Sequence, residues 1–271
     1  MDYKVVDVFT DQVTRGNPVA VVLNASTLSS AEMQSIARWT NLSETTFVVP
    51  PTSPWADYHV RIFTPTGELP FAGHPTLGTA HALLEAGLVE KKPCLVQQCS
   101  RGDINIKVDE NRLLFEIDGI TSEKISLDAV SGALPGLEIT AQPQIVNAGP
   151  LWVVVKSRFE DARDLLNYEP DQERISKFST THKVSGICVF AEYPNNDIEI
   201  RTFAPVEKVP EDPVCGSGNA AVAFYRALNA SYSSFQGRAI HRDGRISVDY
   251  AQSGIWIGGR CVTGVTGKIN I

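Results

Sequence analysis

The stretch Glu211-Asp-Pro-Val-Cys-Gly-Ser-Gly-Asn-Ala-Ala221 decides the fold of this chain, together with a weaker copy of it, Leu69-Pro-Phe-Ala-Gly-His-Pro-Thr-Leu-Gly-Thr-Ala80. Each places a glycine turn directly before a run of small and apolar residues that predicts a helix. A helix that is apolar on every side is expected to be buried on every side. Since the surrounding segments read as strands, we expect a sheet curled around one central helix, built twice.

A second pair of matching segments indicates an internal duplication. Arg61-Ile-Phe-Thr-Pro65 matches Arg201-Thr-Phe-Ala-Pro205 at a spacing of 140 residues, and the same spacing matches Gly78 with Gly218. Similarity at one long spacing is the signature of a repeated structural unit. We interpret this register as unbroken, with few insertions between the two copies.

The predicted fold is therefore α+β, with two pseudo-symmetric domains, each a curled, barrel-like sheet around a central helix. We expect the first domain at residues 1–120 and the second at residues 141–260. Residues 121–140 are rich in glycine, serine and proline, which is typical of a linker. The end of the chain, Lys268 to Ile271, is a candidate strand that returns to the first domain.

Composition and charge exclude several classes of protein. The chain has 271 residues, of which 43% are hydrophobic and 20% charged, as in globular proteins. The net charge of −7 and the absence of a basic stripe argue against nucleic acid and membrane partners. No apolar run approaches the length of a membrane span. The five scattered cysteines predict a reduced, cytoplasmic protein without disulfides.

The two glycine turns are candidate anion sites. Backbone amides at the start of a helix carry partial positive charge and bind carboxylates or phosphates, which makes Gly73 and Gly216 candidate substrate-binding residues. Side chains that can move protons stand beside them: His74, Asp212, Cys215 and Ser217. An anchored carboxylate next to acid and base groups favours proton abstraction from the neighbouring carbon.

Glu44 is the candidate base that structure explains least, because it opens an otherwise apolar strand. In a partly desolvated environment its pKa would rise toward that of a useful base. The other candidates also have structural interpretations. His74 and Asp212 can cap a helix or a turn, and Ser217 can be an ordinary first-turn serine. Cys215 can be a packing residue, although the helix dipole is expected to lower the pKa of its thiol.

Motifs for cofactors and metals fail on context. Gly216-Ser-Gly-Asn-Ala-Ala221 matches a dinucleotide pattern, but it lacks the alternating strands and helices and the later acidic residue of that fold. The histidines show no metal-ligand spacing with the cysteines. We therefore expect no cofactor and no metal.

At these residues the chain resembles the PhzF-like (phenazine biosynthesis) family of the diaminopimelate epimerase-like superfamily. The matching signatures span nearly the whole chain in the family's order: Val6-Asp-Val-Phe-Thr10, Gly16-Asn-Pro18, Ser43-Glu-Thr45, Pro70-Phe-Ala-Gly-His-Pro-Thr76 and Glu211-Asp-Pro-Val-Cys-Gly-Ser217. The resemblance implies a cofactor-free active site in the cleft between two similar domains, and a homodimer. It also implies isomerisation of a dihydro-hydroxyanthranilate by a glutamate that shuttles a proton.

The resemblance assigns roles to this chain's residues one by one. Glu44 occupies the position of the proton-carrying glutamate, and His74, Asp212 and Ser217 match the other polar site residues. The related epimerases use one cysteine on each turn, whereas this chain has Cys215 on one turn and Ala72 on the other. A two-thiol racemase is therefore disfavoured.

We thus expect an isomerase that shifts a proton on a small carboxylic acid. Two alternatives stay open: an epimerase that uses Glu44 and Cys215 from opposite faces, and a non-catalytic protein that binds small carboxylates. A nicotinamide-dependent oxidoreductase is a more distant reading.

Overall fold

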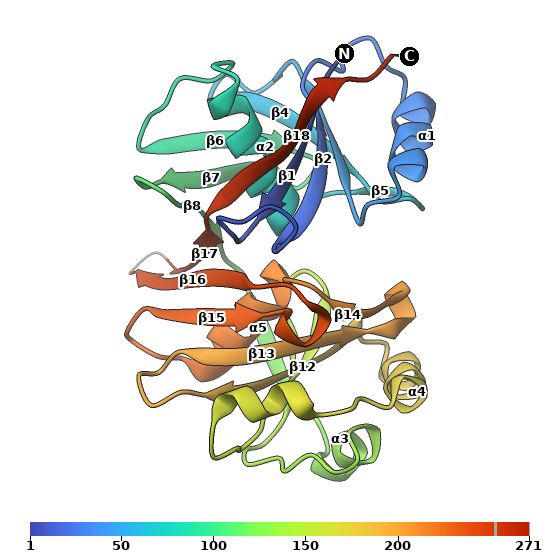
Figure 1. Cartoon of the computed structure of the whole chain (residues 1–271), viewed down its shortest axis with the longest axis vertical. Coiled ribbons are helices and arrows are strands. Elements are labelled where there is room, and N and C mark those ends of the chain that lie inside the picture. Colours follow the sequence, from blue (N-terminus) through green and yellow to red (C-terminus); the bar gives the residue numbers. More distant parts are fainter. Residues whose placement is uncertain (252–253, 271) are drawn as a thin grey trace. The chain divides into compact units, whose positions relative to one another are not determined.

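In the computed structural model, which describes residues 1–251 and 254–270, the chain forms two units, each with curled strands around a central helix (Figure 1). Unit 1 comprises Met1–Glu116 and Gly258–Ile271, and unit 2 comprises Ile117–Ile257. The fold class is the expected α+β class, with curled sheets and few helices.

Unit 1 is a curled sheet in the order β18, β1, β2, β3, β4, β6, β7, β8. The β2/β3 and β4/β6 pairs are parallel and the other pairs are antiparallel. The strand bounds are β1 Asp2–Val8, β2 Asn17–Val22, β3 Thr45–Val49, β4 Tyr58–Phe63, β5 Glu68–Leu69, β6 Cys94–Cys99, β7 Gly102–Val108, β8 Leu113–Ile117 and β18 Cys261–Lys268. The short β5 pairs with the end of β4.

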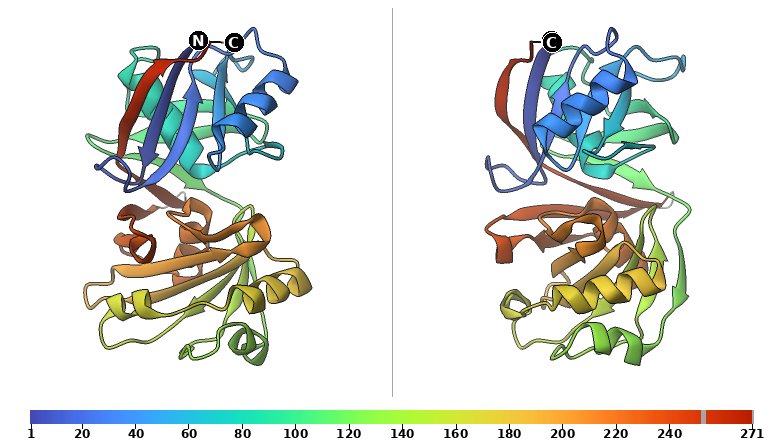
Figure 2. Two further views of the ribbon diagram at one scale, coloured as in Figure 1. Left: turned by 45° about the vertical axis from the view of Figure 1, so that its right-hand side comes forward. Right: turned by 90° about the vertical axis from the view of Figure 1, so that its right-hand side faces the viewer.

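The central helix of unit 1 is α2 (Gly73–Glu85), and its buried residues run almost without interruption from His74 to Leu83. This confirms the prediction of a helix without a polar face, because such a helix must be surrounded by apolar strands. The second helix, α1 (Ser30–Thr40), lies on the outside of unit 1 (Figure 2). A capping box between Ser29 and Glu32 starts it.

Unit 2 repeats this order with β9, β10, β11, β12, β13, β15, β16. Here the β11/β12 and β13/β15 pairs are parallel. The bounds are β9 Thr121–Lys124, β10 Gln144–Asn147, β11 Leu151–Lys156, β12 Gly186–Glu192, β13 Ile198–Ala204, β14 Val209–Asp212, β15 Tyr232–Gln236, β16 Gly244–Ala251 and β17 Gly254–Gly259. Its central helix is α5 (Gly216–Arg226), which is buried from Gly216 to Ala223 except at Ser217.

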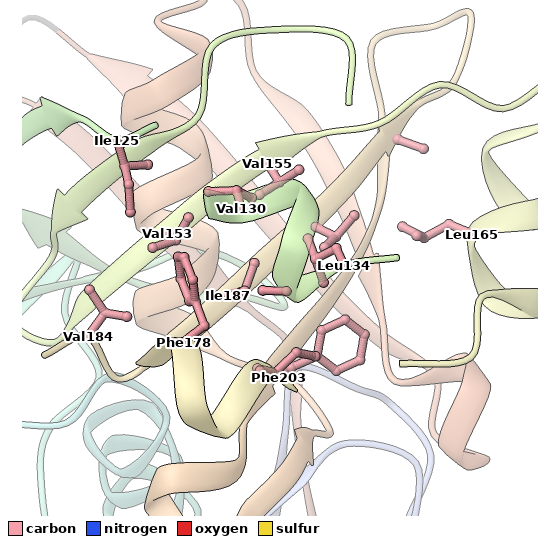
Figure 3. Close-up of a cluster of buried hydrophobic side chains, with 14 of the residues drawn as sticks. Ile125, Val130, Leu134, Val153, Val155, Leu165, Phe178, Val184, Ile187 and Phe203 are labelled. Atoms are coloured by element: carbon pink, nitrogen blue, oxygen red, sulfur yellow. The ribbon is translucent and has the colours of Figure 1, made fainter. Parts of the chain in front are cut away.

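The outer face of the unit 2 sheet is covered by α3 (Leu127–Ala133) and α4 (Gln172–His182). Figure 3 shows side chains of both helices, among them Val130 and Phe178, packed with strand residues such as Ile187 and Phe203. Because α5 covers one face and these helices cover the other, β12 and β13 are buried along nearly their whole length, and β12 is an almost continuous apolar run. Short 3-10 turns complete the unit: η1 Ala162–Asn167, η2 Pro205–Glu207 and η3 Arg238–Ile240.

The segment for which we expected a linker, residues 121–140, belongs to the sheet and core of unit 2. It contains β9, which pairs with β10, and α3, whose Val130 and Ala133 are buried in the hydrophobic cluster. The residues of β9, Thr-Ser-Glu-Lys, are all exposed. An exposed edge strand carries no apolar alternation, which is why the sequence pattern did not indicate it.

The strand β18 plays in unit 1 the part that β9 plays in unit 2, since it pairs with β1 as β9 pairs with β10. We expected a returning strand only from Lys268. The observed strand begins at Cys261 and ends at Lys268, and Ile271 lies outside the described residues. Among the described residues, no helix has the length and apolar character needed to cross a membrane.

The matching arginines of the repeat make matching contacts. In β4, Arg61 donates two hydrogen bonds to Glu68, and its guanidinium lies 5.1 Å from the Phe63 ring centroid. In β13, Arg201 bonds Glu211 in the same bidentate way and lies 5.0 Å from the Phe203 ring. A guanidinium suits both a carboxylate and an aromatic face, so the shared arginine and phenylalanine mark one structural element.

The register of the repeat is broken, contrary to our interpretation. The central helices begin at Gly73 and Gly216, which are 143 residues apart rather than 140. Gly78 lies in the middle of α2, where an added Cβ would meet Val19, whereas Gly218 lies in the first turn of α5. Their match was therefore not a structural one, and the segment that contains η2 holds the three additional residues.

We predict that the same arginine substitution destabilises the protein more at position 201 than at position 61. Arg201 and Glu211 have side chains only 6% and 7% exposed, whereas Arg61 and Glu68 are 24% and 32% exposed. Breaking a buried pair leaves an uncompensated charge and costs about 3–5 kcal/mol, while a more exposed pair contributes about 1 kcal/mol or less. Arg201→Met should lower the thermal midpoint clearly more than Arg61→Met. Equal decreases in the thermal midpoint would contradict the assignment of Arg201 and Glu211 as the buried pair.

Candidate active site

The start of α2 is a glycine turn pressed against a phenylalanine. Ala72 is the N-cap residue and has no side-chain hydrogen bond to the helix. Gly73 follows, and a Cβ atom there would lie 2.5 Å from Cζ of Phe115. This close approach explains why glycine stands at the first position of the helix.

Next to this turn, a histidine and a glutamate face each other in unit 1. His74 is the second residue of α2, and its Nε2 atom lies 3.3 Å from Oε2 of Glu44. Glu44 directly precedes β3, and its carbonyl oxygen accepts a hydrogen bond from the amide of Ala20 in β2. The two side chains are 9% and 16% exposed. The parallel β2/β3 pair therefore holds Glu44 against the first turn of α2.

Burial raises the pKa of Glu44 above its ordinary value, because a carboxylate loses hydration in this position. A hydrogen bond from Ser43 opposes this shift only in part. The direction agrees with the sequence-based expectation for Glu44. A carboxyl group with a raised pKa holds its proton to higher pH than an ordinary glutamate, which suits an acid–base catalyst.

The start of α5 carries the second group of predicted residues, all in unit 2. Cys215 is the N-cap residue, and its sulfur accepts a hydrogen bond from the amide of Gly218 at 3.2 Å. The Asp212 carboxylate accepts from the amide of Val214 at 3.0 Å, which closes the preceding turn. Ser217 is the second residue of the helix, the place that His74 holds in α2.

Two buried residues that the sequence did not indicate complete this turn. The Gln236 side chain accepts from the amide of Cys215 and donates to the carbonyl of Asp212, so it bridges both ends of the turn. The Trp152 indole donates to Oγ of Ser217 at 3.0 Å. Gln236 comes from β15 and Trp152 from β11, and both lie far from the motif in sequence.

The Cys215 thiol differs from the expectation of a lowered pKa. It is 5% exposed, and burial, followed by the charge of Asp212, raises its pKa well above the ordinary value. The hydrogen bonds from Ser217 and from the Gly218 amide oppose this only partly. Desolvation thus outweighs the helix terminus, and Cys215 is a protonated thiol at neutral pH.

The structure brings the predicted residues together in two groups. Glu44, Gly73 and His74 gather at the start of α2, and the others, Asp212, Cys215, Gly216 and Ser217, gather at the start of α5. The amides of Gly216 and Ser217 donate to no other group in the described part of the chain, so they remain able to bind an anion.

Two cavities, one in each unit, lie away from these residues. A cavity of about 310 Å³ in unit 1 is lined by residues that include His81 and Arg112. Another of about 500 Å³ in unit 2 is lined by residues that include Arg201 and Glu211. Neither contains a predicted site residue. Over residues 1–251 and 254–270, no cluster of three or more metal-ligating side chains occurs.

A central helix with polar groups at its first turn, enclosed by a curled sheet and present in two copies, defines the epimerase-like class of folds. The model of the PhzC-PhzF family, described as phenazine biosynthesis-like protein, matches residues 6–267. The chain belongs to this family.

Relatives and solved structures agree with this assignment. The chain is 37% identical over 290 residues to Antisense-enhancing sequence 1 of Schizosaccharomyces pombe, covering 98% of this chain and 97% of that protein. It is 56% identical over 231 residues to the trans-2,3-dihydro-3-hydroxyanthranilate isomerase of Pseudomonas chlororaphis, covering 83% and 79%. The crystal structure of a PhzF-family protein of Bacillus anthracis superimposes with a TM-score of 0.86 at 26% identity, covering 100% and 99%. These matches identify the chain as an isomerase of the family.

The raised pKa of Glu44 predicts a pH-dependent gain in stability for Glu44→Gln. The folded protein holds this proton more tightly than the unfolded chain, so stability is full below the unfolded pKa and is lost as the pH rises through the folded pKa. The variant avoids this loss. Its thermal midpoint should match that of the wild type near pH 4 and exceed it near pH 8, by about 4 °C for each 1 kcal/mol.

The exposed Glu123→Gln is the matched control and should show no such trend. A Glu44→Gln variant that is less stable than the wild type at pH 8 would show that the ionised carboxylate is stabilised by His74 instead.

The contact between Gly73 and Phe115 predicts that Gly73→Ala is destabilising. The added methyl group must displace a buried ring, which costs about 1–3 kcal/mol. Gly67→Ala is the control, because a Cβ atom there meets nothing within 4 Å. Denaturant unfolding checks the pair, and Phe115→Leu should recover part of the loss in the Gly73→Ala background.

Proposed function

We propose that this isomerase shifts a proton on a small carboxylic acid, with Glu44 as the base that takes the proton from one carbon and returns it to another. The observation that carries the proposal is a largely buried carboxylate, with a raised pKa, 3.3 Å from His74 at the start of a helix. A group that returns the proton it removes needs a pKa near the working pH. The shift itself uses proton donors and acceptors alone, so the proposal includes no cofactor.

The remaining roles follow from the chemistry of each group. His74 is proposed to exchange a proton with Glu44 and to orient its carboxylate, because the two side chains are in contact. Asp212 and Ser217 are proposed to position the substrate at the start of α5. The amides at Gly73 and Gly216 are proposed to bind the substrate carboxylate, since helix N-termini favour anions.

The substrate class is taken from a relative. The Pseudomonas chlororaphis protein is named for trans-2,3-dihydro-3-hydroxyanthranilate, a cyclic carboxylic acid with a double bond next to which a proton can move. We propose a substrate of this kind for the present chain. Two-thiol racemisation receives no support, because Ala72 caps α2 and the Cys215 thiol is protonated.

The test is deuterium incorporation at carbon. The protein is incubated in D2O with trans-2,3-dihydro-3-hydroxyanthranilate and with other small cyclic and amino carboxylic acids, and the products are read by NMR and mass spectrometry. Glu44→Gln should lower the exchange rate by at least about 100-fold, since it removes the general base. The rate with the wild type should rise with pH through a pKa above the ordinary glutamate value of about 4.3.

Matched variants separate the alternatives. Glu123→Gln makes the same chemical change on an exposed strand and should exchange at the wild-type rate. Unchanged exchange in Glu44→Gln would show that another group is the base. Loss of exchange in Cys215→Ser as well would favour the epimerase that uses Glu44 and Cys215. Tight binding of the acids without any exchange would favour a non-catalytic binding protein.

A further inference from the structure

The hydrogen bond between Trp152 and Ser217 has a fixed direction. An indole nitrogen can only donate, because it has no free lone pair. At 3.0 Å from the indole nitrogen, Oγ of Ser217 must therefore be the acceptor. The hydroxyl hydrogen of Ser217 is then directed away from the indole and is available to an acceptor, while one lone pair of Oγ stays free.

A glycine makes room for this indole. Trp152 in β11 pairs with Gly186 in the parallel strand β12. A Cβ atom on Gly186 would lie 3.0 Å from Cζ3 of Trp152 and 1.9 Å from the carbonyl oxygen of Phe203. Trp152 as a whole residue is only 4% exposed, so its indole is packed tightly by its neighbours.

The position in unit 1 that corresponds to Gly186 carries a different kind of residue. Thr45 pairs with Phe63 as Ile187 pairs with Phe203, so the residues before them, Glu44 and Gly186, occupy corresponding positions. In unit 1 this position carries the carboxylate that contacts His74. In unit 2 this position is Gly186, which has no side chain. The indole of Trp152 on the adjacent strand contacts Ser217, the second residue of the helix, instead.

Few groups compete for the hydrogen of Ser217. The sulfur of Cys215, 3.6 Å from Oγ of Ser217, is a weak acceptor for this hydrogen and also accepts from the amide of Gly218. The amides of Gly216 and Ser217 point to no other group in the described residues. A carboxylate oxygen placed at this turn would meet two amides and one hydroxyl that can all donate.

We propose that Trp152 is a positioning residue: it fixes Ser217 as a hydrogen-bond donor to the substrate carboxylate. This inference rests on the proposed function and extends it to a residue that does not touch the substrate. A side chain at position 152 that cannot donate leaves Ser217 free to turn its hydrogen inward, and the carboxylate then loses a directed hydrogen bond.

The test is a double-mutant cycle on the full chain, with anthranilate as the probe and isothermal titration calorimetry as the measurement. Trp152→Phe keeps most of the ring volume and removes the donor. It should weaken anthranilate binding about 10-fold, the amount expected for loss of one hydrogen bond to a charged group. Ser217→Ala should weaken binding at least as much. Because Trp152 acts through Ser217, the double variant should bind no more weakly than Ser217→Ala.

The control is Trp55→Phe, which changes an indole that is 79% exposed and should leave binding unchanged. A readout without ligand is the indole 1H–15N resonance of Trp152, whose hydrogen should exchange with solvent faster in Ser217→Ala than in the wild type. An unchanged exchange rate would show that the hydrogen bond is absent and would overturn the proposal.

Each further outcome decides. If the loss of binding free energy in the double variant equals the sum of the losses in the two single variants, Trp152 does not act through Ser217 and only packs. If Trp152→Phe binds anthranilate with wild-type affinity, Trp152 does not contribute to binding. Either result overturns the inference. If D2O exchange by the wild type is intact in these cases, the proposed function stands and only this inference falls. If the wild type neither exchanges deuterium nor binds anthranilate, both fall together.

Discussion

The burial of an apolar helix inside each sheet is the constraint on which the rest of the structure depends. Neither α2 nor α5 offers a polar face to water, so strands must enclose each helix and leave only its ends accessible. At the amino-terminal turn of each helix, unsatisfied amides and partial positive charge collect. The fold thus gives each unit a helix N-terminus suited to an anion, and the chemistry that we propose depends on the side chains around it.

The two copies use this common plan for different purposes. In unit 1 the second helix residue, His74, meets a carboxylate with a raised pKa. In unit 2 the second residue, Ser217, meets an indole that cannot change its protonation. In our proposal, a proton-transfer group and a fixed hydrogen-bond donor are therefore divided between the two copies of one architecture. This division suits a proton shift with a single base better than a symmetric exchange between two thiols.

How much of this was predictable depends on the range of each interaction. Local sequence predicts the central helices, the two strands that contain Arg61 and Arg201, and the motif residues at the helix starts, because a turn and its helix are contiguous. Trp152 and Gln236 do not, since their roles arise from strand pairing across dozens of residues. The three-residue offset between the copies and the exposed strand β9 were also missed. Insertions and edge strands leave no apolar periodicity to detect.

The strand β18 carries a consequence for the order of synthesis. Unit 2 is a continuous segment, Ile117–Ile257, whereas unit 1 needs β18, which follows the whole of unit 2 in the chain. A ribosome therefore delivers every strand of the second unit before it delivers the last strand of the first. Until then the edge of β1 that pairs with β18 in the folded protein is unpaired. Unit 1, although most of it is made first, can therefore complete its strands only after unit 2 has been synthesised.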